Sequence, residues 1–341
     1  MAVVKSDSAI SSELAGDLKV ACLPLESVAP KMKDWHPGSD GKVLDLVHPS
    51  LFPLIYGRSK VLASGRVALE DSVEYAGKGE IIEVPNESQV KPGSSYAGGP
   101  YWVGRKAPFF WSKNFQWLPC QVNFTDNEEI KITSYINNLH PVKYQDLYTV
   151  IAKCIAKSVP LWNRTLSSTK SSRKPRIDMG MTQYDFPQGQ ETPDDYRLDG
   201  VYNDYERRNT WETTTRVLIQ PEPDDYALYE ASGDNKIDLR TQFRSTGLQV
   251  IVKLANIELS PEKPDYDGGS WHIEGQLNER ICASALYYYD SENITESFLA
   301  FRHRVDDDIE TKAYDQVGRT IDPKMNLSKF NYFERLLLLI P

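Results

Sequence analysis

The 341-residue sequence has few cysteines and no pattern that would link them. Cys22, Cys120, Cys154 and Cys282 are far apart, and no two of them form a C-x-x-C pair. Neither a disulfide framework nor a zinc ribbon is therefore indicated. Charged residues also interrupt every apolar run between positions 1 and 21, so we expect no secretory signal. Together these absences predict reduced thiols in an intracellular protein, either cytoplasmic or nuclear.

Long apolar runs and an excess of positive charge are missing as well. The apolar run Leu336–Ile340 is far shorter than the roughly 20 residues that span a bilayer, so we expect no membrane-embedded segment. Lys and Arg number 39 against 48 Asp and Glu, a net charge of -9 that makes nucleic acid an unlikely partner. With 40% hydrophobic and 26% charged residues, the composition is typical of a globular protein.

Several catalytic motifs are absent too. The chain contains no G-x-S-x-G nucleophile elbow, no phosphate-binding P-loop, no H-E-x-x-H zinc helix and no G-x-G-x-x-G turn. Hydrolase, nucleotide triphosphatase and dehydrogenase functions therefore lose their usual support. We assign no catalytic residue from the sequence.

Among the features that are present, the clearest is a helix from Tyr144 to Val159. Its apolar positions recur at spacings of three and four, and Pro160 is expected to end it. Just before it, two β-prone runs, Phe115–Phe124 and Ile130–Ile136, flank a polar turn and predict a hairpin.

The last third of the chain alternates in the manner of strands. Leu248–Leu259 and Ile281–Tyr289 are predicted strands, and Ser270–Gly275 is expected to be extended after a Gly-Gly turn. The stretch from 163 to 245, which mixes basic, acidic and Tyr-rich pieces, is instead predicted to be a long excursion on the surface.

His272 and Glu274 form the one candidate site for chemistry. On a strand, residues two apart project from the same face, so an imidazole and a carboxylate could bind one metal ion there. Two histidines and one carboxylate form the facial triad of non-haem Fe(II) oxygenases, and this pair supplies two of the three ligands. With five histidines and 48 acidic residues, about 0.7 H-x-D/E match is expected by chance, so the spacing alone is a weak signal.

Several longer segments carry a resemblance to a known family. They are Phe115–Cys120, Ser134–Pro141, Pro160–Asn163, Gly247–Ile257, Gly268–Gly275 and Tyr287–Ser297. These segments resemble a fungal family of uncharacterised proteins, catalogued as domain of unknown function forty-two forty-six. The resemblance runs with gaps from about Val43 to about Val305.

That family resembles the Fe(II)/2-oxoglutarate oxygenases, which implies a fold, a reaction and two cofactors. The implied fold is α+β, a partial double-stranded β-helix (jelly-roll or cupin-like) core with N-terminal helices. Fe(II) and 2-oxoglutarate are the implied cofactors, His272 and Glu274 the implied metal ligands, and the substrate is an unknown small molecule or protein. The boundaries that follow are an N-terminal segment (1–42), a helix-containing part (43–162), the variable excursion (163–245), the β-helix core (246–305) and a divergent tail (306–341).

The sequence departs from the family pattern after Val305, where a strand with a further histidine is expected. The histidine that follows Glu274 is His303, which is a poor third ligand because Arg302 and Arg304 oppose a dication. His36, His48 and His140 each precede a proline and are interpreted as structural.

We therefore expect a truncated and impaired oxygenase. The alternative is a non-catalytic β-helix module for binding or scaffolding, with the Tyr-rich excursion as its contact surface.

Overall fold

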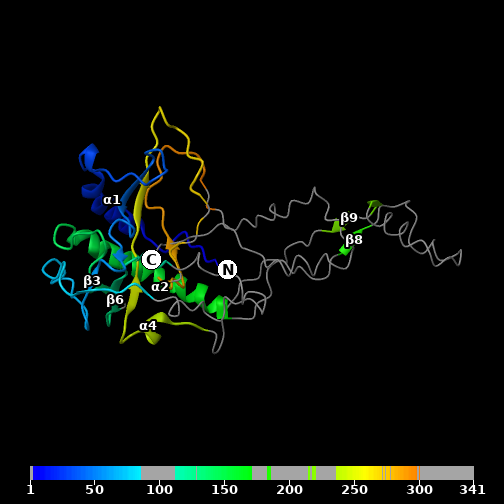
Figure 1. Ribbon diagram of the computed structural model, residues 1–341. Helices are drawn as coiled ribbons and strands as arrows, with labels where there is room; N and C mark the ends of the chain where they lie inside the picture. Colours follow the sequence, from blue (N-terminus) through cyan, green and yellow to red (C-terminus); the bar gives the residue numbers. More distant parts are fainter. Residues whose placement is uncertain are drawn as a thin grey trace. The chain divides into compact units, whose positions relative to one another are not determined.

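The structure is a computed structural model that describes residues 3–85, 112–127, 129–170, 183–185, 214–215, 217–219, 236–270, 272, 274–276, 278–297 and 299. The described elements fall into two units (Figure 1). The second unit contains β8 (Gln183–Asp185) and β9 (Val217–Ile219), which pair in antiparallel fashion. The first unit contains all the other elements and the candidate site.

The first unit contains helices and short strands. The helical elements are α1 (Ser12–Glu26), η1 (Pro30–Met32), α2 (Gln145–Lys170) and α4 (Leu239–Gln242). The strands are β1 (Val43–Val47), β2 (Leu54–Ile55), β3 (Lys60–Val61), β4 (Glu80–Ile81), β5 (Phe115–Gln116), β6 (Cys120–Phe124), β7 (Ile130–Ile132), β10 (Leu248–Val250), β11 (Leu254–Ile257) and β12 (Ala285–Leu286). Helices α1 and α2 pack against each other and share a core with β1, β6, β7 and β10.

The described strands form small antiparallel sheets. β6 lies between β10 and β7, while β1–β11, β2–β5 and β3–β4 form two-stranded sheets. The expected α+β class agrees with this mixture of helices and sheets. The expected jelly-roll core is not seen in the described part of the chain, because its strands pair in separate sheets and close no barrel. The predicted hairpin is confirmed as β6 and β7, with Phe124 opposite Ile130. Its predicted strands were too long, because β5 at the start of Phe115–Phe124 pairs with β2 instead, and β7 ends at Ile132.

The predicted end of the long helix at Pro160 is wrong, because α2 continues to Lys170. Pro160 lies on the exposed side of α2, where the carbonyl that loses its helical donor can face water. Tertiary contacts hold the second half of the helix. Ser167 Oγ accepts a hydrogen bond from Ile237 N at 2.8 Å, and Asn163 Oδ1 accepts one from Leu239 N at 3.0 Å.

Three strand predictions also need correction. Leu248–Leu259 is not one strand, because β10 pairs with β6 and β11 with β1, and the chain turns between the two sheets. Within Ile281–Tyr289, only β12 is a strand. The described residues of Ser270–Gly275 form no strand, since the chain bends at Glu274 and Gly275, where Gly275 adopts a φ of 73°.

Strand β1 is flanked on both sides by other parts of the chain. On one side, His36 N donates to Val43 O and Asp45 N donates to Asp34 O, both at 2.8 Å. On the other side β11 pairs with β1, and the register shifts between Asp45 and Val47. On a regular strand, side chains three residues apart point to opposite faces of the sheet. A bulge adds one residue to the strand, so side chains three apart across it point to the same face. The bulge thereby brings His48 to the same side as Asp45.

One buried hydroxyl fixes the turn before α2 and gives a stability prediction. Tyr148 Oη accepts a hydrogen bond from Ile136 N at 2.9 Å and donates one to Leu139 O at 2.8 Å. Tyr148→Phe leaves both buried backbone groups without this partner, so we expect a loss of about 2 kcal/mol in the free energy of unfolding, measured in urea. Tyr135→Phe is the matched control. It removes one bond to Asn138 N at an exposed tyrosine and should cost less than about 1 kcal/mol, and equal losses would contradict this account.

Some sequence predictions lie outside the described residues. They are His303 with its neighbours Arg302 and Arg304, the apolar run Leu336–Ile340, and most of the surface excursion (163–245).

Candidate functional site

The structure brings the predicted metal ligands His272 and Glu274 together, although by a bend rather than on a strand. His272 Nε2 lies 3.1 Å from Glu274 Oε1. The side chain of His272 is 59% exposed, whereas that of Glu274 is 19% exposed, so solvent reaches the pair from the histidine side. Whether the pair binds a metal ion stays a prediction.

Hydrogen bonding sets the tautomer of His272. Its Nδ1 lies 2.8 Å from Ser270 O, and because a carbonyl only accepts, Nδ1 must carry the hydrogen. In the neutral ring, Nε2 is then an acceptor that faces a carboxylate oxygen, which also only accepts. A cation or a proton between them relieves this opposition. A backbone carbonyl behind the imidazole is the usual support of a metal-binding histidine.

The donor atoms of this pair fit a divalent ion. Adjacent ligands of an octahedral ion with bonds of about 2.1 Å lie about 3.0 Å apart. The 3.1 Å between His272 Nε2 and Glu274 Oε1 is close to that value. Among the described residues, no third histidine, cysteine or acidic side chain completes a group of three around this pair.

Lys253 connects this pair to strand β1. Its Nζ lies 3.7 Å from Glu274 Oε1, and both side chains are largely buried. Lys253 directly precedes β11, and His48 directly follows β1. Because Val47 is opposite Leu254, the antiparallel pairing places Lys253 and His48 at the same end of the two strands.

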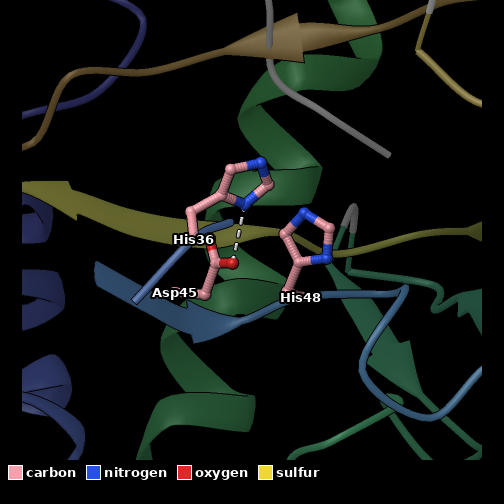
Figure 2. A group of neighbouring side chains, drawn as sticks. All are labelled: His36, Asp45 and His48. Carbon is pink, nitrogen blue, oxygen red and sulfur yellow. Dashed lines mark hydrogen bonds and ion pairs between the residues drawn. The ribbon is translucent and has the colours of Figure 1, made fainter. Parts of the chain in front are cut away.

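A second group of side chains of the types that can bind a metal ion lies at β1, and we call it the His36 cluster: His36, Asp45 and His48 (Figure 2). One possible ligand atom from each residue lies within 4.8 Å of the others. His36 Nδ1 is 2.8 Å from Asp45 Oδ2, and the two imidazole rings are 5.2 Å apart, between centroids, at an angle of 54°. Figure 2 shows the His36 ring above the Asp45 carboxylate, joined to it by the dashed line, and the His48 ring beside them.

The His36 cluster is buried on one side and open on the other. The Asp45 side chain is 6% exposed and His48 is 8% exposed, whereas the His36 side chain is 41% exposed. Asp45 Oδ1 is buried, and no donor from the described part of the protein reaches it. Burial lowers the pKa of His48, and although the charge of Asp45 raises it, the net direction is downward. His48 is therefore neutral at pH 7, which is the form that binds metal ions.

Sequence reasoning missed this cluster. Asp45 and His48 are three apart, which on a regular strand means opposite faces, and the bulge that overturns this leaves no motif in the sequence. One signal was available. The turn between His36 and β1 contains Gly38 and Gly41 at positive φ, which allows the chain to fold back on itself.

The cysteines offer no reactive thiolate among the buried positions. Burial raises the pKa of Cys22 and Cys120 to about 12 and that of Cys154 to about 11. These three are protonated at neutral pH and are poor nucleophiles. Cys282 is exposed, and all four are unpaired.

Comparison with known proteins identifies the family. Residues 1–334 match the family model described as "Protein of unknown function (DUF4246)". The chain belongs to the DUF4246 family. The match covers both groups of candidate metal ligands, but the description of DUF4246 names no activity. No curated protein and no solved structure matches this DUF4246 chain. None of the helices within the described ranges combines the length and the apolar character needed to cross a membrane.

Proposed function

We propose that this protein is a metal-dependent oxidoreductase of the Fe(II)/2-oxoglutarate type, in which His272 and Glu274 bind the metal ion and turnover is slow. The observation that carries the proposal is the orientation of these two side chains. His272 Nε2 and Glu274 Oε1 face each other at 3.1 Å, and because Ser270 O accepts from Nδ1, the imidazole presents Nε2 to the carboxylate, where a metal ion or a proton can lie between the two atoms. When bound, Fe(II) with 2-oxoglutarate supplies the oxidising chemistry.

The residues of the chain have defined parts in this proposal. Ser270 O fixes the His272 ring, and Lys253 holds Glu274 from the buried side. The exposed His272 side leaves room for a co-substrate and for an unknown small-molecule or protein substrate. Turnover is slow because the described residues offer two ligands at this position, where an oxygenase site has three.

Succinate formation tests the reaction. With purified protein, Fe(II) and 2-oxoglutarate, we expect succinate at a rate below about 0.1 per second, or about 100-fold under the median enzyme turnover. His272→Ala should remove it, and His140→Asn should not, because His140 contacts the turn before α2 and belongs to neither group of metal-binding residues. Turnover near 10 per second would contradict the impairment, and turnover unaffected by His272→Ala would contradict the site.

A non-catalytic binding module is the second candidate, and one contact favours it. Lys253 Nζ, 3.7 Å from Glu274 Oε1, can balance the charge of this carboxylate without a metal ion. The two candidates differ in metal binding: the module should be a stable, monodisperse protein whose affinity for Fe(II) is unchanged by His272→Ala.

A further inference from the structure

The structure assigns a second metal site to the His36 cluster: we propose that His36, Asp45 and His48 bind one divalent transition-metal ion of the Zn(II), Co(II) or Fe(II) type. This site shares no ligand with the His272–Glu274 pair and does not depend on the proposed function, although the charges of Lys253 and Glu274 act on His48. Two imidazoles and one carboxylate are a donor set that such ions favour.

The arrangement of the three residues is the first argument. One ligand atom of each lies within 4.8 Å of the other two. Tetrahedral ligands with bonds of about 2.1 Å lie about 3.4 Å apart. His36 Nδ1 and Asp45 Oδ2, 2.8 Å apart, must therefore separate by about 0.6 Å, and a pair at the 4.8 Å limit must approach by about 1.4 Å. Rotation of the half-exposed His36 ring can contribute to both changes.

The buried oxygen of Asp45 is the second and independent argument. Asp45 Oδ2 has the His36 ring nitrogen as its partner, whereas Oδ1 is buried with no hydrogen-bond donor in the described ranges. A buried carboxylate oxygen without a partner is unfavourable, and a cation is the group that satisfies it best. The side chain is 94% buried, so bulk water does not compensate.

Access and competition are the remaining conditions. The exposed side of His36 gives an ion a path from solvent and leaves a coordination position open, as in catalytic zinc sites with three protein ligands. Two hydrogen bonds compete with the ion. One joins His36 Nδ1 to Asp45 Oδ2 at 2.8 Å. In the other, Ser50 N donates to His48 Nδ1 at 3.2 Å, which places the hydrogen of the neutral ring on Nε2. This hydrogen bond is at the long limit for its type, and metal binding replaces it.

Titration with Co(II), followed by its visible absorption and by calorimetry, tests the site. The titration is made in the His272→Ala protein, which removes the other proposed site. We expect binding of one Co(II), with an affinity that falls by at least about 100-fold when His36→Ala is added. Loss of a group that only hydrogen-bonds a metal ligand costs up to about 100-fold in affinity, so loss of a ligand itself should cost at least as much. Asp45→Asn should act in the same way, and His140→Asn should leave the affinity unchanged.

The controls distinguish loss of the second site from loss of the fold. His36 is half exposed, so His36→Ala should fold, and circular dichroism checks this even if Asp45→Asn were unstable. No Co(II) binding in the His272→Ala protein would overturn the second site, and so would an affinity unaffected by His36→Ala in folded protein. The oxygenase proposal would stand in either case, because it depends on His272 and Glu274.

Discussion

In the His272→Ala protein, which lacks the other proposed site, Asp45→Asn is expected to abolish stabilisation by Zn(II) while changing the metal-free stability by less than about 1 kcal/mol. At a free ion concentration of 100 times the dissociation constant, one bound ion adds about 2.7 kcal/mol to the free energy of unfolding. The His272→Ala protein should show this gain in urea unfolding, and a chelator should reverse it. The His272→Ala, Asp45→Asn protein should show none, because it lacks the anionic ligand of the His36 cluster.

The metal-free part of this prediction follows from the surroundings of Asp45. Its side chain is 6% exposed and its Oδ1 has no donor among the described residues. Asparagine is neutral and keeps an oxygen that can accept from His36, but its amide group takes the buried place of Oδ1, so the two effects oppose each other and we expect a change of less than about 1 kcal/mol without metal.

An exposed aspartate serves as the control for Asp45→Asn. Asp71 lies on the surface, so Asp71→Asn should change neither the metal-free stability nor the response to Zn(II). A variant at position 45 that keeps the zinc response would contradict the second site. If Asp45→Asn lowers the free energy of unfolding of the metal-free protein by more than about 1 kcal/mol, the account of Asp45 as a buried carboxylate that binds a metal ion would be contradicted.

Local patterns of the sequence predicted the local structure. The three- and four-residue spacing in Tyr144–Val159 and the polar turn after Phe124 correctly predicted the first half of α2 and the β6–β7 hairpin. The end of α2 could not be predicted from Pro160, because it depends on Ser167 and Asn163, whose partners are about 70 residues away.

Strand pairing was harder to predict because it is set by distant residues. The alternation in Leu248–Leu259 fits one strand as well as two, and only the pairing with β6 and with β1 shows where the chain turns. The same limit applies to the candidate sites. His272 and Glu274 were found because they are two apart, whereas His36, Asp45 and His48 depend on a fold-back and a bulge.

The second large effect concerns His272 and is a loss of Fe(II) affinity. The imidazole is one of two ligands that the described residues supply at this site, so His272→Ala should weaken binding by at least about 100-fold. The Asp45→Asn protein is the right background, because it retains the His272–Glu274 pair and lacks the second site. His140→Asn in the same background controls for the loss of a histidine elsewhere.

The measurement that tests the central claim most directly is therefore an anaerobic Fe(II) titration of Asp45→Asn and of Asp45→Asn with His272→Ala. We predict one bound Fe(II) in the first protein, and a loss of at least about 100-fold in affinity in the second. Equal binding by the two folded proteins, or no binding by the first, would contradict the claim that His272 and Glu274 hold a metal ion.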